Sequence, residues 1–301
     1  MADSSWLWAV FTIVAAAAQT VRNAAQRELT GKLGTVGATL VRFLFGCPFA
    51  IVFLLAMLGA GGALSRPTLS FWPWLLAGAL TQVAATALML AAMEKRSFVV
   101  AIAYIKTEPV QVALFGLLFL GDAVTPLMAA AIAIATAGVI VMSMKASTWG
   151  GASGGGWRAT ALGLLAGACF ALSAIGFRGA ILSLHDQSYA VAATFTMAAG
   201  LIVQAILLTL YLTLRDRAVL RAIVAAWRPS VFAGFTGALA SQFWFLAFAL
   251  ATAASVRTLA LVEVLFAQAI SHFVFRQPMS RPEGIGIMVI VTGVVLLIWA
   301  Y

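Results

Sequence analysis

Apolar residues fill long stretches of this chain, and short polar segments separate them. Each stretch is about 20 residues long, which as an α-helix gives roughly 30 Å, the thickness of the hydrocarbon core of a bilayer. The pattern therefore predicts an all-α integral membrane protein with ten transmembrane helices. The predicted spans cover approximately residues 6–21, 36–58, 72–93, 98–120, 124–144, 159–181, 189–214, 230–250, 254–275 and 285–299.

Composition agrees with a location in lipid. Of the 301 residues, 63% are hydrophobic and 9% are charged, and the mean hydropathy is +1.06. Such a chain has too little polar surface to coat a soluble globule. Asp3 stands where a signal peptide would carry a basic residue, so the first span is expected to remain in the mature protein. Cys47 and Cys169 lie inside apolar spans, where packing is expected and neither a disulfide nor a metal site is supported.

The formal net charge of +9 is compatible with nucleic-acid binding, but the basic residues do not form a stripe. They gather in or beside the loops after the first, third, fifth, seventh and ninth spans, whereas Arg66 and Arg178 lie in or near even-numbered loops. By the positive-inside rule the odd-numbered loops are cytoplasmic, and both termini lie outside the cytoplasm. The residues that carry this signal are Arg22, Arg27, Lys32, Lys95, Arg96, Lys145, Arg158, Arg215, Arg217, Arg221, Arg228, Arg276 and Arg281.

The ten predicted spans divide into two sets of five. A Gly-rich linker at residues 149–157 separates a first repeat, residues 1–148, from a second repeat, residues 158–301. A repeat with an odd number of crossings enters on one face of the membrane and leaves on the other. Two tandem copies must therefore have opposite orientations, which predicts inverted repeats around a central cavity, a transporter architecture.

Two acidic residues stand in the middle of apolar spans. Glu108 lies about ten residues, or roughly 15 Å, inside the fourth span, and Glu263 is central in the ninth. A charge near the bilayer centre costs about 2.5–3.5 kcal/mol on insertion scales, so each is a candidate functional residue. Pro109 removes a backbone donor and disfavours helical geometry at Glu108, which predicts a broken helix there. If one acid acts on substrate, Glu108 is therefore the stronger candidate.

Cationic residues accompany these acids. Arg42 and Lys106 are expected at a similar depth to Glu108 and Glu263, and Arg257 lies nearer the outer end of the ninth span. Two interpretations remain open. The charges form a salt-bridge network that holds helices together, or some of them face a water-filled cavity and act in ion pairing, gating or substrate binding. Arg257 is equally compatible with snorkelling to the interface.

Neutral polar and aromatic residues add to the candidate cavity lining. Gln82 and Gln242 follow matching Gly-Ala-Leu motifs in the third and eighth spans, and Tyr104 precedes Lys106. Trp244 and Phe248 share a face of the eighth span. Aromatic side chains in pockets contact ligands, but at helical spacing they also serve as packing residues.

These features together resemble the drug/metabolite transporter superfamily and, within it, the EamA-type exporters. The resemblance rests on the five-plus-five spans, the linker, Lys106-Thr107-Glu108-Pro109-Val110, Phe119-Leu120-Gly121-Asp122, and the closing Gly138-Val139 and Gly293-Val294. Arg276-Gln277 replaces the Gly-acid pair expected in the second half, so no role is carried over to that position. Among these exporters the chain is most similar to aromatic amino-acid exporters, which implies a basket-like bundle and outward movement of amino acids or related metabolites.

The sequence therefore predicts an inner-membrane secondary transporter that exports neutral amino acids, aromatic ones included, or related small metabolites by alternating access. Efflux of organic cations or drugs is the alternative, and a passive channel is a third. We expect no enzyme activity, cofactor, metal or nucleic-acid partner, because the chain carries no HExxH motif, nucleotide loop or Cys/His cluster. The predicted architecture is compatible with a monomer in the bilayer.

Overall fold

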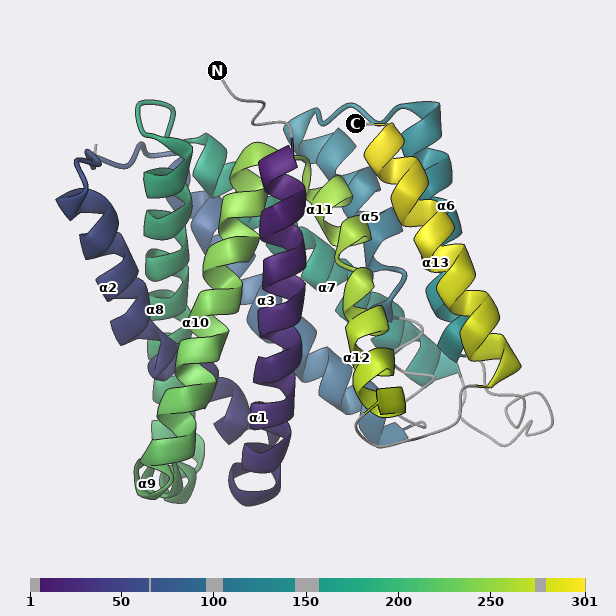
Figure 1. Cartoon of the computed structure of the whole chain (residues 1–301). Coiled ribbons are helices and arrows are strands. Elements are labelled where there is room, and N and C mark those ends of the chain that lie inside the picture. Colours follow the sequence, from purple (N-terminus) through teal and green to yellow (C-terminus); the bar gives the residue numbers. More distant parts are fainter. Residues whose placement is uncertain (1–5, 65, 96–104, 144–156, 274–279, 301) are drawn as a thin grey trace. The chain divides into compact units, whose positions relative to one another are not determined.

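The computed structural model describes residues 6–64, 66–95, 105–143, 157–273 and 280–300, and every regular element in them is a helix (Figure 1). This confirms the prediction of an all-α chain. Tyr104 and most of the predicted linker lie outside these residues. The elements are α1 (Leu7–Leu44), α2 (Gly46–Gly59), α3 (Phe71–Lys95), α5 (Glu108–Phe115), the π-helix η2 (Gly116–Leu120), α6 (Pro126–Ser143), α7 (Trp157–Leu182), α8 (Tyr189–Arg215), α9 (Arg217–Ala225), α10 (Trp227–Leu250), α11 (Ala253–Leu259), α12 (Val262–Phe273) and α13 (Arg281–Trp299).

Six helical stretches in the described part of the chain are long and apolar enough to cross a bilayer. Two shorter apolar helical stretches, Glu108–Leu120 and Pro126–Met142, add to them. Large apolar side chains such as Leu214, Met288 and Val295 are exposed, as suits a surface that faces lipid. The number of ten spans and the inverted repeat stay predictions. The six stretches are Leu29–Gly59, Phe71–Met89, Ala161–Leu182, Tyr189–Arg215, Trp227–Leu250 and Arg281–Trp299.

The helices group into two compact units. Unit 1 comprises residues 1–80 and 176–251, and unit 2 comprises residues 81–175 and 252–301. Helices α3 and α7 each contribute one part to each unit, since the boundaries fall after Leu80 and Ile175. Each unit therefore combines segments from both predicted repeats.

In unit 1, α1 runs along α10 and α2 packs on α8 (Figure 1). Helix α1 continues through residues 22–35, where the sequence pattern predicts a loop between the first two spans. Its break comes at Gly34, which adopts a φ of 65° that residues with a side chain rarely adopt. Arg22, expected in that loop, is instead buried, and its side chain passes over the bare backbone of Gly237 on α10.

Arg178 has a structural role in unit 1 that its place in the sequence did not indicate. It lies inside α7 and is buried. Its guanidinium donates to the carbonyl oxygen of Phe248 at 2.6 Å and to that of Ala251. The last carbonyls of a helix lack partners within the helix and carry partial negative charge. Arg178 therefore caps the carboxyl end of α10 and is not a loop charge that sets topology.

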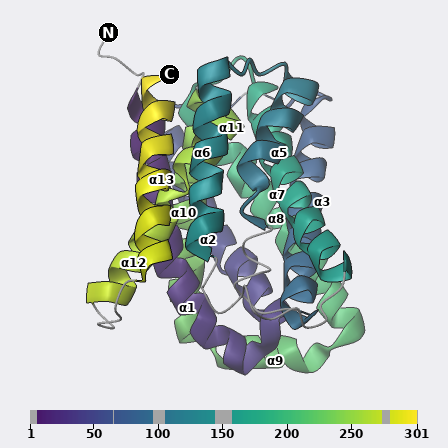
Figure 2. The same ribbon diagram turned by 90° about the vertical axis from the view of Figure 1, so that its right-hand side faces the viewer.

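In unit 2, α6 and α13 lie side by side, as Figures 1 and 2 both show. Glycines allow this approach. A Cβ atom on Gly138 would lie 2.6 Å from the backbone nitrogen of Ile290, and one on Gly293 would lie 2.5 Å from that of Ala135. Small residues that let two backbones approach are a common basis of helix association in lipid. The Gly-Val pairs near the ends of the two predicted repeats thus form part of one helix interface.

We predict that Gly138→Ala destabilises the protein by about 1–3 kcal/mol, because the added methyl group overpacks this interface. The matched control is Gly31→Ala, where the new methyl group meets nothing within 4 Å. That change is expected to be neutral or stabilising, since alanine is the better helix former by about 1 kcal/mol. Thermal unfolding in detergent measures both, and equal melting temperatures for the two variants would contradict the close packing.

Candidate functional site

The first part of the site is a turn just before α5. Ile105 is helical, Lys106 and Thr107 form the turn, and α5 starts at Glu108 with Pro109 as its second residue. Proline is tolerated at this position because the first N–H groups of a helix have no acceptor within it. The Thr107 carbonyl accepts from the backbone nitrogen of Val110 at 3.2 Å. The sequence therefore explains locally why a helix begins here.

A second turn of the same kind lies in the predicted ninth span, where the sequence pattern predicts one continuous helix. Helix α11 ends at Leu259, Ala260 and Leu261 form a turn, and α12 starts at Val262. Tight turns satisfy the backbone, because Leu261 N donates to Thr258 O at 3.1 Å and Glu263 N donates to Ala260 O at 3.0 Å. Neither alanine nor leucine disfavours a helix. This break therefore has no local cause in the sequence.

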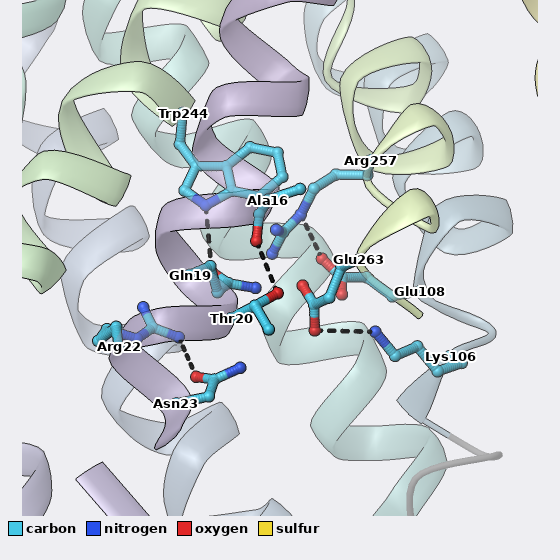
Figure 3. Close-up of polar contacts among 10 residues, drawn as sticks. All are labelled: Ala16, Gln19, Thr20, Arg22, Asn23, Lys106, Glu108, Trp244, Arg257 and Glu263. Atoms are coloured by element: carbon cyan, nitrogen blue, oxygen red, sulfur yellow. Dashed lines mark hydrogen bonds and ion pairs between the residues drawn. The ribbon is translucent and has the colours of Figure 1, made fainter. Parts of the chain in front are cut away.

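Each turn has a basic residue in it or before it and an acidic residue after it, and the charges pair across the two turns (Figure 3). The Nε of Arg257, in the last turn of α11, lies 2.7 Å from Oε1 of Glu108. The Nζ of Lys106 lies 3.6 Å from Oε1 of Glu263, in the first turn of α12. Thus the cation of each turn pairs with the anion of the other. The four charges sum to zero.

Local backbone fields support three of these positions. Glu108 and Glu263 each lie in the first turn of a helix, where the N-terminal end of the helix dipole favours a negative charge. Arg257 lies in the last turn of α11, where the dipole favours a positive charge. The side chains are 15–23% exposed, so both pairs are largely removed from surrounding solvent. Pairing is what makes four charges tolerable in this environment.

The structure adds two polar residues that the sequence interpretation left out. Gln111 lies one helical turn after Thr107, and its Nε2 donates to Thr107 Oγ1 at 3.1 Å. The Gln111 Oε1 atom is buried and accepts no hydrogen bond from any described residue. Gly167 on α7 makes room for this turn, because a Cβ there would lie 3.3 Å from the Ile105 carbonyl oxygen. The spacing from Thr107 to Gln111 is the signal that could have identified this pair.

Three predicted cavity residues lie on α10 in unit 1. Gln242 donates from Nε2 to Thr194 Oγ1 at 2.7 Å. Figure 3 shows the second contact, in which Trp244 donates from its indole nitrogen to Gln19 Oε1 at 3.1 Å. Trp244 also stacks on Phe248, with ring centroids 6.5 Å apart. All three side chains are buried within unit 1. These contacts are those of a packed polar and aromatic core, and ligand contact at these residues stays a prediction.

Two further predicted residues lie on α1 and α3. Arg42 lies in the last turn of α1 in unit 1, half-buried, with its guanidinium carbon 5.2 Å from the centroid of the Phe43 ring. Gln82 lies on α3 in unit 2 and is half-buried. Of the predicted site residues, the structure thus brings together Lys106, Glu108, Pro109, Arg257 and Glu263. Within the described part of the chain, no group of three or more His, Cys, Asp or Glu residues is arranged to hold a metal ion.

Residues 6–144 match the EamA-like transporter family. With the apolar helices, this match indicates a multi-pass membrane protein of the small-molecule transporter class. Among the 28 chains of solved structures that match, one titled "Crystal structure of protein" aligns with a TM-score of 0.75 over 98% of each chain. Its sequence identity is 15%, so the likeness concerns the fold alone. A search of curated proteins finds no match.

We predict that Glu108→Gln and Arg257→Gln each lower the free energy of unfolding by about 1–3 kcal/mol, because each leaves a partly buried charge without its partner. The double variant is expected to be more stable than the sum of the two losses implies. Denaturant titration in detergent, in a double-mutant cycle, measures this coupling. Asp186→Asn, at an exposed loop residue, serves as the control and should change stability by less than about 0.5 kcal/mol. Strictly additive losses would show that the 2.7 Å contact contributes nothing.

Proposed function

We propose that this protein is a secondary transporter that exports amino acids or related small zwitterionic metabolites across the bacterial inner membrane. The observation that carries the proposal is the crossed pairing of Lys106 with Glu263 and of Arg257 with Glu108 at two helix breaks. Broken helices with charged residues beside them are a recurring form of transporter binding site. A zwitterion presents one positive and one negative group, which matches the composition of this cluster.

The two ion pairs also favour zwitterionic substrates over organic cations. An organic-cation exporter requires a carboxylate that is available to the cation, but both glutamates here have a basic partner within 4 Å. A lone cation bound here would give the cluster of four charges a net charge of +1, which is costly in a partly desolvated site. A zwitterion compensates both partners. Amino acids and related metabolites are therefore the preferred substrates, and efflux of organic cations remains the second candidate.

The proposed mechanism is alternating access, in which the two inverted repeats rock around a midplane site. Lys106, Glu108, Arg257 and Glu263 supply the charged groups of this site, and Gln82 on α3 supplies an amide. Arg257 acts in ion pairing or gating through its contact with Glu108. The mechanism uses no cofactor, and both termini face away from the cytoplasm.

An uptake panel in proteoliposomes tests the proposal. Purified protein is expected to catalyse saturable uptake of neutral amino acids, aromatic ones included, with stimulation by the same amino acid on the opposite side of the membrane. A carrier shows this counterflow because the loaded site returns faster than the empty one. The panel includes organic cations and is run with and without a pH gradient. Flux that neither saturates nor shows counterflow would indicate a channel, and uptake of cations alone would support the second candidate.

A further inference from the structure

The two ion pairs at the helix breaks differ in geometry. The contact between Arg257 and Glu108 is 2.7 Å, which is within the range of a direct charge-assisted contact. Lys106 Nζ and Glu263 Oε1 are 3.6 Å apart, which is longer than a hydrogen bond. The charged atoms of the first pair are therefore closer together, although the orientation of Arg257 Nε and Glu108 Oε1 does not make a hydrogen bond. In the second pair the two charges attract each other, but neither uses its hydrogen-bonding capacity on the other.

The chemistry of the two cations strengthens this difference. Arginine presents a rigid planar fork, whereas lysine carries a compact charge with three rotatable donors on a flexible stem. Arg257 lies inside helix α11, but Lys106 lies in the turn before α5. The side chains of the Lys106–Glu263 pair are 23% and 18% exposed, against 18% and 15% for Arg257 and Glu108. All three features make Lys106–Glu263 the pair that can open and exchange partners.

A zwitterion fits the opened pair. Its carboxylate would accept from the Lys106 ammonium, and its own ammonium would donate to the Glu263 carboxylate, so that two direct contacts replace one long attraction. The charge of the site stays at zero throughout. A ligand with only one of the two charges would give the cluster of four charged side chains a net charge, which is costly in a partly desolvated site. In α5, one helical turn after Thr107, the buried Gln111 Oε1 is a further acceptor.

We propose that Lys106 and Glu263 are the pair that binds substrate and that they select for ligands carrying both an ammonium and a carboxylate group. Arg257 and Glu108 instead hold the two turns in register and act as positioning residues. This inference rests on the transport function proposed above, and it names the substrate class of that site. It also reverses the preference for Glu108 that Pro109 suggested from the sequence.

Competition in the counterflow assay tests the proposal. The labelled probe is L-phenylalanine, or the neutral amino acid that the uptake panel shows to be carried fastest. The competitors are the same amino acid, its N-acetyl derivative, which lacks the ammonium, and its amide, which lacks the carboxylate. The wild-type protein is expected to prefer the zwitterion over both derivatives by at least about tenfold, the value of one charge-assisted hydrogen bond.

The variants then separate the two pairs. Glu263→Gln should raise the KM of the zwitterion about tenfold or more and bring the N-acetyl derivative to within about threefold of it. Lys106→Gln should do the same for the amide. Glu108→Gln should lower the melting temperature but keep both preferences. Glu283→Gln, at the exposed capping box of α13, is the matched control and should keep the wild-type KM and both preferences.

Each possible result decides the matter. Unchanged preferences in Glu263→Gln, or an equal loss of preference in Glu108→Gln, would overturn the inference while leaving transport intact. If the single variants do not fold, the exchanged pair Lys106→Glu with Glu263→Lys keeps the net charge. It should still require both charged groups on the ligand but with a raised KM, and a wild-type KM would count against direct contact. Absence of saturable transport in the wild-type protein would instead refute the proposed function itself.

Discussion

The two helix breaks in unit 2 depend on one constraint, which is that charges removed from solvent must be neutralised by neighbours because little water is available to solvate them. Lys106, Glu108, Arg257 and Glu263 meet this constraint through two crossed ion pairs. Each ion pair joins the turn before α5 to the turn before α12. If one turn moved far from the other, both ion pairs would therefore separate. The ion pairs thus connect segments that are far apart in the sequence. Apolar packing in lipid would by itself specify this pairing of segments only weakly.

The helix breaks and the charges depend on each other. A break within a span leaves backbone groups that need partners, and the tight turns at Thr107 and at Ala260–Leu261 provide them. The same breaks create helix ends. The N-terminal dipoles of α5 and α12 favour Glu108 and Glu263, and the C-terminal dipole of α11 favours Arg257. Helix α7 accommodates the first turn because Gly167 has no side chain to obstruct it. The helix break before α5 therefore combines three features, which are room beside Gly167, the dipole of a helix end and polar backbone groups.

The sequence predicted the parts of this site that have local causes. Apolar stretches indicated membrane helices, and Glu108 stood out by its cost in lipid. Pro109 indicated a broken helix at Glu108, and the structure places Glu108 as the first residue of α5. The break at Ala260–Leu261 was not predictable, because both residues favour a helix. The partners of the acids were equally hidden, since pairing depends on how α5 and α11 pack. Arg178 and Arg22 were misread as loop charges because sequence patterns do not show which carbonyls or glycines a long side chain reaches.

The zero sum of the four charges has an electrical consequence. A membrane potential does work only on net charge that moves through its field, at about 2.3 kcal/mol per elementary charge for each 100 mV. The crossed pairs carry none, and under the proposed function a zwitterion bound between Lys106 and Glu263 would carry none either. Empty and loaded forms would then respond alike to voltage, so the cell's electrical gradient gives this site no direction. Any net direction of export would have to come from the solute concentrations on the two sides or from a proton.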